Sequence, residues 1–287
     1  MLPDDGRAPV IDEIDRAACT IDLTIYLLSD DAVIDALVRA EARGVEVRIL
    51  YEPAPFGGGA GIVETTEDLA RHGVELRSGS EDVALIHAKY LVIDGQVAIV
   101  TNQNLTFSAF ESNRELGVIT TVPADVATLA SIFEADWSGL PPPVPTDRMI
   151  LSPINARATL LEHIDSARST LRLYAEVIRD DEVIDALSTA AQRGVTVQVL
   201  VNEPEDDLDE TVDATLASNG VEVRHADGHY IHSKGLIIDE QTVVVGSHNP
   251  TAQSLDRNRE VSLVLGEPSA VQHAVDVFDQ DWADSAP

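Results

Sequence analysis

Two copies of one short motif contain every lysine of this chain. The six residues share the spacing H-x-K-x4-D: His87, Lys89 and Asp94 in the first copy, and His232, Lys234 and Asp239 in the second. Seventeen arginines carry the remaining positive charge of the side chains. A compact ammonium, rather than a planar guanidinium fork, is therefore favoured at these two positions.

Two imidazoles and two ammonium groups in one pocket would suit displacement at phosphorus. One imidazole can attack, while the other protonates the leaving oxygen and then activates water or an alcohol. The ammonium groups would stabilise the charge on the phosphoryl oxygens. Three further side chains, Asn104, Ser247 and Asn249, follow the motifs, and their amides and hydroxyl can hydrogen-bond phosphate oxygens. The pattern predicts an anionic substrate.

Each motif is expected to lie on a strand, where residues two apart share a face. His87 and Lys89 would then project together, as would His232 and Lys234. Asp94 is seven residues after His87, an odd offset, so a regular strand excludes direct pairing between them. We expect Asp94, and likewise Asp239 in the second copy, to fix a turn or pair with a basic group.

The whole chain is a duplication, and the motifs occupy equivalent places in its halves. Three segment pairs illustrate the repeat: 30–37 with 180–187, 113–115 with 258–260, and 133–137 with 278–282. We expect a first repeat at 1–140, a proline-rich linker at 141–147 and a second repeat at 148–287. Two homologous units predict a pseudo-twofold axis between them.

Helical and strand patterns alternate within each repeat. In the first repeat they predict helices at 8–18, 31–43, 62–72 and 124–136, and strands at 21–28, 45–51, 74–77, 86–93, 96–101 and 115–121. Asp94-Gly95 is typical of a hairpin between two of these strands. Such alternation indicates an α/β fold in which each repeat forms α-β-α layers.

Several smaller features are assigned by default to packing or to the rim. Trp137 and Trp282, at equivalent places, are expected to anchor the core. Cys19 is interpreted as a small buried residue. Phe107 and Phe110 are expected in the core, with an acyl groove as the alternative. The glycine-rich segment 56–61 is predicted to form a loop at the rim of the pocket.

Composition limits the partners of the chain. Its formal net charge is −31, with 50 Asp and Glu against 19 Lys and Arg. The favoured interpretation is a carboxylate-coated surface adapted to a salt-rich cytoplasm, and the alternative is an acidic face for a basic partner. This charge disfavours polyanions at low salt. The sequence contains no apolar run long enough to span a bilayer and no signal-peptide pattern at its start, so we expect a cytoplasmic protein.

At these residues the chain resembles the phospholipase D superfamily, which carries H-x-K-x4-D-x6-G-S-x-N twice and uses both copies in one site. The second copy fits throughout, whereas the first has Thr101-Asn102 where Gly-Ser is expected. Asn102 would then make the contact with phosphate that the serine hydroxyl makes in the family motif. The resemblance implies catalysis by the two His-Lys-Asp sets through a phosphohistidine, without metal or cofactor. It implies His87 as nucleophile and His232 as general acid.

The resemblance also implies an acidic residue that contacts the histidine of the other copy. Glu115 and Glu260 match it, each eleven residues after the asparagine of its motif. Crossed pairing would put Glu260 on His87 and Glu115 on His232. The alternative for each glutamate is a surface ion pair with its neighbouring arginine.

The leading hypothesis is a phosphodiesterase or phosphatidyltransferase acting on phospholipids, with peripheral contact to a membrane and no obligatory protein partner. A metal-independent endonuclease of the same superfamily is the second hypothesis, because it would use the same chemistry on nucleic acid. A non-catalytic phosphate-binding module is the third, supported by the departure at Thr101-Asn102. The motifs do not choose between water and an alcohol as acceptor.

Overall fold

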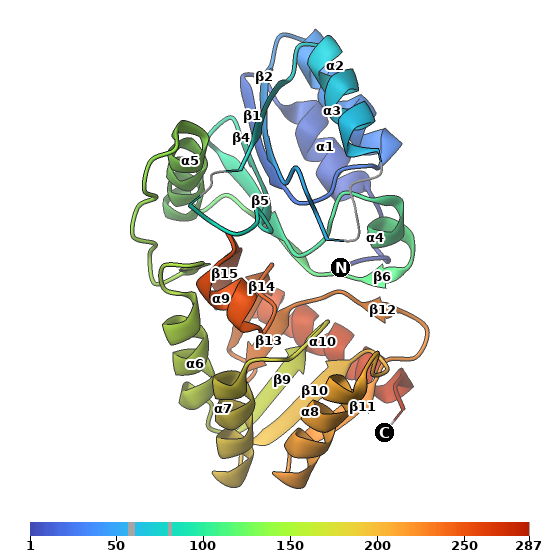
Figure 1. Ribbon diagram of the computed structural model, residues 1–287, viewed down its shortest axis with the longest axis vertical. Helices are drawn as coiled ribbons and strands as arrows, with labels where there is room; N and C mark the ends of the chain where they lie inside the picture. The colour runs from blue at the N-terminus through green and yellow to red at the C-terminus, as the bar shows by residue number, and fades with distance from the viewer. Residues whose placement is uncertain (57–60, 80–81, 287) are drawn as a thin grey trace.

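Each half of the chain forms one mixed β-sheet covered by helices (Figure 1), in a computed structural model that describes residues 1–56, 61–79 and 82–286. The predicted rim segment 56–61 therefore lies largely outside the described residues. The two sheets are stacked along the long axis of the molecule, with the first repeat above the second in the view of Figure 1. This is the expected α/β fold with two layered repeats.

The first sheet has six strands in the order β3-β2-β1-β4-β5-β7. Strands β1, β2 and β3 are parallel, and β4, β5 and β7 continue the sheet in antiparallel pairs. Its elements, with the short strand β6, are α1 (Ala8–Arg16), β1 (Thr20–Ile25), α2 (Asp31–Ala42), β2 (Glu46–Tyr51), α3 (Ile62–Arg71), β3 (Glu75–Ser78), β4 (Lys89–Ile93), β5 (Val97–Thr101), α4 (Phe107–Glu111), β6 (Asn113–Arg114), β7 (Gly117–Thr120) and α5 (Pro123–Ser138).

The second sheet repeats this order and adds one edge strand, giving β11-β10-β9-β13-β14-β15-β8. The added strand pairs antiparallel with β15. The elements of this half are β8 (Met149–Leu151), α6 (Ala156–Ser166), β9 (Thr170–Tyr174), α7 (Asp181–Gln192), β10 (Thr196–Val201), α8 (Asp207–Ser218), β11 (Glu222–His225), β12 (Tyr230–Ile231), β13 (Gly235–Ile238), β14 (Thr242–Gly246), α9 (Ala252–Asp256), β15 (Val261–Leu265) and α10 (Pro268–Asp284).

The predicted hairpin after the first motif is present. Asp94 and Gly95 have φ values of 54° and 60°, and the backbone N–H of Gln96 donates to the carbonyl of Ile93 at 2.9 Å. Positive φ at both central residues is characteristic of the type I′ turn, which suits the twist of hairpin strands. The turn holds β4 against β5 and so fixes the direction in which the motif enters the sheet.

Apolar side chains form three cores in layers. One core lies under α1, α2 and α3, and a second lies under α6, α7 and α8. The third lies between the two sheets, where α5 and α10 pack against strands of both halves. The predicted anchors Trp137 and Trp282 are buried in this central core. Burial on both sides of each sheet explains the apolar runs 90–93 in β4 and 243–245 in β14.

Two of the packing predictions are wrong. Cys19 is exposed, because it lies in the connection between α1 and β1 rather than beneath the helix. Phe107 is also exposed, whereas Phe110 is buried. The two phenylalanines are three residues apart on the short helix α4, and only Phe110 belongs to the core beneath the first sheet's helices.

The repeats are joined by backbone contacts near the motifs. Strand β12 pairs in parallel with β6 from the other repeat, and Ile86 bridges Arg259 in the equivalent way. Figure 1 shows β6 and β12 facing each other across the boundary between the halves. No helix among the described residues is long and apolar enough to cross a membrane.

Candidate active site

The segments that carry the histidines bond to the other repeat rather than to their own sheet. The N–H of His87 donates to the carbonyl of Arg259 at 3.0 Å, and the N–H of His232 donates to that of Arg114 at 3.2 Å. The strands begin only at Lys89 and Gly235. The expectation that each His lies within its motif strand is therefore wrong, because pairing with the opposite repeat takes the histidine segment out of the sheet.

Side chains from the ends of β2 and β10 hold the residue before each histidine. Glu52 Oε2 accepts from the N–H of Ile86 at 2.8 Å. Asn202 Oδ1 accepts from the N–H of Ile231 at 2.7 Å, and its Nδ2 donates to the carbonyl of the same residue at 2.8 Å. Both donors are thereby satisfied away from water, which fixes the backbone on which each imidazole is mounted.

Two glutamates contact the histidines across the boundary between the repeats. Glu260 Oε2 lies 2.8 Å from Nδ1 of His87, and Glu115 Oε2 lies 2.8 Å from Nδ1 of His232. Both glutamates are fully buried, so neither forms the alternative surface ion pair. The adjacent arginines bond other carboxylates, Arg114 to those of Asp4 and Asp281 and Arg259 to that of Asp136. The crossed contacts expected from the sequence are both present.

The surroundings of His87 favour its neutral imidazole. Burial lowers the pKa of His87, and nearby Glu260 only partly opposes that effect. Burial also opposes ionisation of Glu260, but His87 and Lys89 outweigh it and lower its pKa to about 2. An ionised Glu260 can only accept, so Nδ1 of His87 carries the proton and Nε2 has a free lone pair.

The two lysines lie behind the histidines in different surroundings. Each Nζ donates to the carbonyl of its motif histidine at 2.6 Å. Burial lowers the pKa of Lys89 to about 7, against the favourable charge of Glu260. Its ammonium also lies 5.1 Å from the centroid of the Tyr26 ring. Lys234 instead bonds the carboxylate of Glu176, in its own repeat.

Side chains of both motifs line one cavity of about 450 Å³. This volume is typical of a small-molecule site. His87 and Asn104 line it from the first repeat, and His232 and Asn249 line it from the second. The second repeat also supplies acidic side chains to its wall, namely Glu203, Glu205, Asp209 and Asp213. The structure thus brings both histidines and both motif asparagines to a single hollow.

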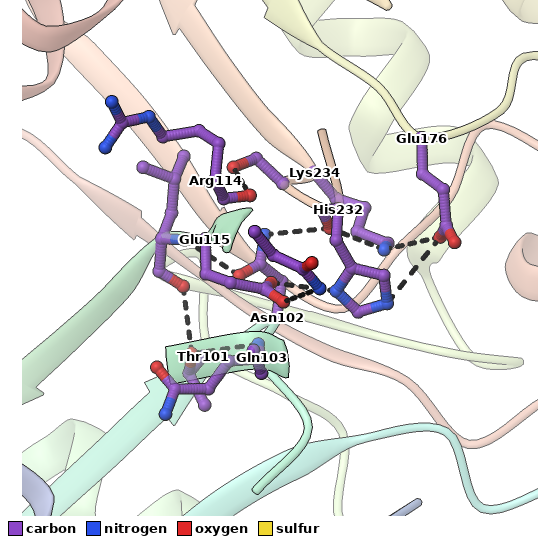
Figure 2. A network of polar contacts seen from close by, with 12 residues as sticks. Thr101, Asn102, Gln103, Arg114, Glu115, Glu176, His232 and Lys234 are labelled. Carbon is purple, nitrogen blue, oxygen red and sulfur yellow. Dashed lines mark hydrogen bonds and ion pairs between the residues drawn. The ribbon is translucent and has the colours of Figure 1, made fainter. Parts of the chain in front are cut away.

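Asn102 and Ser247 do not reach this cavity, contrary to the predicted phosphate contacts. Asn102 is fully buried, donates from Nδ2 to the carbonyl of His232 at 3.2 Å and accepts from the N–H of Leu116 at 2.8 Å (Figure 2). Ser247 is also fully buried and bonds the backbone of Val261. Both side chains satisfy buried backbone groups, and so they support the site instead of lining it.

Asp94 and Asp239 also lie away from the cavity, at the hairpin turns. Asp94 accepts from the backbone N–H groups of Ala18, Cys19 and Thr20 at 2.7–2.9 Å. Asp239 does the same in the second repeat, with the connection between α6 and β9. The prediction that both aspartates are catalytic is therefore corrected. Their carboxylates instead bond the hairpin turns to the backbone at the start of β1 and of β9.

Glu176 is a site residue that the sequence reasoning missed. Its Oε2 lies 2.6 Å from Nζ of Lys234, 3.8 Å from Nε2 of His232 and 3.3 Å from Nδ2 of Asn249. Burial opposes its ionisation, but Lys234 and His232 together hold its pKa well below the usual range. Figure 2 shows the carboxylate turned toward Lys234 and His232. Aligning the two repeats could have found it, because Glu176 aligns with Tyr26 of the first repeat and the carboxylate therefore has no counterpart there.

Comparisons with known proteins agree with this duplicated architecture. A family model described as "Cardiolipin synthase, PLD-like domain" matches residues 10–137 and 160–282, one segment in each repeat. Cardiolipin synthase A of Yersinia pseudotuberculosis is 26% identical over 334 aligned residues, which cover 99% of this chain and 68% of that protein.

Two solved structures share the fold. Polyphosphate kinase from Porphyromonas gingivalis superposes with a TM-score of 0.75 at 17% identity, over 95% of this chain and 48% of that one. Phosphatidylserine synthase from Haemophilus influenzae gives a TM-score of 0.72 at 12% identity, over 98% of this chain and 84% of that one. At these identities the likeness concerns the fold alone, and this chain spans about half the length of the kinase.

Proposed function

The chain belongs to the phospholipase D superfamily and is a phosphodiester hydrolase or transferase of that type; on this premise we propose that it cleaves or transfers the phosphodiester of a phospholipid through a covalent phosphohistidine. One observation carries the proposal. His87 and His232 come from different repeats, yet both line one cavity of about 450 Å³, and each is braced at Nδ1 by a buried glutamate.

In the first step, the lone pair on Nε2 of His87 attacks phosphorus, forming an N–P bond. The bond from phosphorus to the leaving oxygen breaks, and that oxygen takes the proton of His232. The charge that develops on the phosphoryl oxygens is stabilised by the ammonium groups of Lys89 and Lys234. Glu260 stabilises the positive imidazole ring formed at His87, since its carboxylate accepts from Nδ1.

In the second step, water or an alcohol attacks the same phosphorus and gives its proton to His232. The N–P bond breaks, and the electron pair returns to Nε2 of His87. Both imidazoles then regain their starting protonation, so the cycle needs no other proton carrier. Water as acceptor yields hydrolysis, and an alcohol yields transfer.

A phospholipid is the favoured substrate class for three reasons. Cardiolipin synthase A, whose alignment covers 99% of this chain, is named for the synthesis of a phospholipid. The acidic wall of the cavity would repel a polynucleotide. Arg179, which lines the cavity, is paired with Asp206 and Asp209 and so does not offer a free guanidinium to a phosphate backbone.

A lipid substrate also implies contact with a membrane surface. Phe56 lines the cavity and is 94% exposed. Tyr230, also on the cavity wall, is 42% exposed. Aromatic side chains of this kind can enter the interfacial region of a bilayer, so we propose a peripheral contact around the cavity mouth.

The test is a substrate panel in molar KCl with EDTA. Phosphatidylglycerol, phosphatidylcholine and single-stranded DNA would be compared, each with the wild type and with His87→Asn and Lys234→Ala. We expect turnover of a phospholipid, loss of turnover in both variants, and a trapped phospho-enzyme that is absent in His87→Asn.

Other outcomes would redirect the assignment. Turnover of DNA alone would favour the endonuclease. No turnover of any substrate would favour a phosphate-binding module. Activity that EDTA abolishes would contradict the metal-independent mechanism, and label retained by His87→Asn would contradict the nucleophile.

A further inference from the structure

The two halves of the active site are unequal at one pair of equivalent positions. Asp30 and Asp180 cap matching helices, each accepting from the N–H three residues on. Four residues before each cap, the first repeat has Tyr26 and the second has Glu176. Both side chains line the cavity, so the duplicated fold carries a neutral ring on one side and a carboxylate on the other.

In the first half-site, Tyr26 packs on the motif residues. Its ring lies 4.7 Å from the imidazole of His87 at 70° and 5.1 Å from the ammonium of Lys89. Burial raises the pKa of Tyr26, so the phenol is neutral near pH 7. Tyr26 therefore contacts His87 without adding a charge beside it.

In the second half-site, Glu176 adds a negative charge beside His232. Its carboxylate is 3.8 Å from Nε2, the ring nitrogen opposite to the one that bonds Glu115. His232 is therefore flanked by two carboxylates, whereas His87 has one carboxylate, Glu260, at Nδ1 and an aromatic ring. An anion within about 4–6 Å favours the protonated form of an imidazole.

The remaining charged groups around His232 come from both repeats, and the acidic wall of the cavity comes from the second. Lys234 is paired with Glu176 and offsets part of its charge. Other ionisable neighbours in the cluster include His87, Lys89, Glu260 and Tyr230, with His248 beside Glu260 and Glu205 beside Tyr230. The motif residues and their crossed glutamates form two matched sets of His, Lys and Glu. Among the described residues, Glu176 is the further carboxylate that lies within 4 Å of a motif histidine, so it breaks the electrostatic equivalence of His87 and His232.

We propose that Glu176 is a positioning residue that directs the reaction, keeping the proton on His232 as the donor and leaving His87 as the nucleophile. The inference rests on the proposed function and deepens it, because the matched motifs alone leave two directions open. With Glu176 present, the N–P bond forms on His87, and the proton passes from His232 to the leaving oxygen.

The first experiment compares pH profiles of kcat/KM for Glu176→Gln, Glu176→Asp and the wild type. The alkaline limb reports loss of the protons that activity requires, on the general acid and on Lys89, whose pKa is about 7. We expect Glu176→Gln to move that limb to lower pH by about one unit, since the flanking anion is gone and the positive charge of Lys234 is no longer offset. Glu176→Asp should restore most of the position of the limb.

Glu203→Gln is the matched control. It removes a carboxylate that lines the same cavity, without an ion pair to His232 among the described residues. Its alkaline limb should stay within about 0.3 pH units of the wild type, because an anion beyond contact range is screened in molar KCl. A uniform loss of activity in Glu176→Gln, with the limb unmoved, would reduce Glu176 to a structural partner of Lys234 and overturn the proposal.

The second experiment locates the trapped phosphoryl group by peptide mass spectrometry. We expect the wild type to carry it on His87, and the exchanged variant Tyr26→Glu/Glu176→Tyr to carry a measurable fraction on His232. Label on His232 in the wild type, or label confined to His87 in an active exchanged variant, would refute the inference. If the exchanged variant is inactive, the wild-type label and the pH profile decide. Either refutation leaves the phosphohistidine enzyme intact, whereas absence of any label and turnover removes the proposed function.

Discussion

Lys89→Met should stabilise the fold while abolishing activity. Burial lowers the pKa of Lys89 to about 7 from its ordinary 10.5. Below pH 7 the side chain is charged in both the folded and unfolded states, and the buried charge weakens folding. At about 1.4 kcal/mol for each pKa unit, the cost is about 5 kcal/mol. It disappears as pH rises from 7 to 10.5, because the lysine is then neutral in both states.

The contacts of Lys89 reduce the expected gain. Its Nζ donates to the carbonyl of His87 at 2.6 Å, and leaving that carbonyl without this donor costs about 1–3 kcal/mol. The variant should therefore be more stable than the wild type by about 2–4 kcal/mol at about pH 6. Methionine is flexible enough to fill the volume of the lysine stem, so we expect little loss of packing.

Lys234→Met is the matched control, because the other lysine has a carboxylate partner. Its Nζ lies 2.6 Å from Oε2 of Glu176, and its removal leaves that carboxylate without its cation. We expect a loss of about 1–3 kcal/mol. The assay is urea unfolding in molar KCl at about pH 6, 8 and 10, with turnover measured in parallel. A Lys89→Met variant less stable than the wild type at pH 6, or a gain that does not change with pH, would refute the reasoning.

Three further predictions concern residues that support the site. Asp94→Ala removes the acceptor for three backbone N–H groups. Urea unfolding should show an unfolding free energy lower by about 1–3 kcal/mol, with kcat/KM of the folded enzyme unchanged. A tenfold fall in kcat/KM would instead make Asp94 a catalytic residue. Asn102→Ala unpairs the N–H of Leu116 and removes one of the two donors to the carbonyl of His232. The variant should lower both the unfolding free energy, by a similar amount, and kcat; unchanged thermal unfolding would contradict the contact. Glu260 has a folded pKa of about 2, below its ordinary 4.5, so its stabilisation is complete above pH 4.5 and is lost as pH falls toward 2. The difference in unfolding free energy between the wild type and Glu260→Gln should shrink over that range, and a constant difference would contradict it.

Local sequence signals predicted most of the secondary structure, because they act within a few residues. Asp94-Gly95 can adopt positive φ at both positions, and the predicted hairpin formed there. Asp30 precedes an apolar helical pattern and caps α2 by accepting from the N–H of Val33. The strand expected at 86–93 begins only at Lys89, since the residues before it pair with the opposite repeat. That choice depends on a partner more than a hundred residues away, which no local pattern contains.

The chemistry of the site followed from residue types, but its assignment to positions depended on the tertiary structure. The doubled motif by itself determined two histidines, two lysines and a duplicated α/β fold, because spacing and alternation are properties of the chain. Only the packing of the repeats decided that Asn102 would bond the backbone of His232, and only the tertiary fold of the second repeat brought the carboxylate of Glu176 to the imidazole of His232. The physical reason is that burial sets the use of a polar side chain, because each buried donor or acceptor must bond whichever partner the tertiary structure brings within reach.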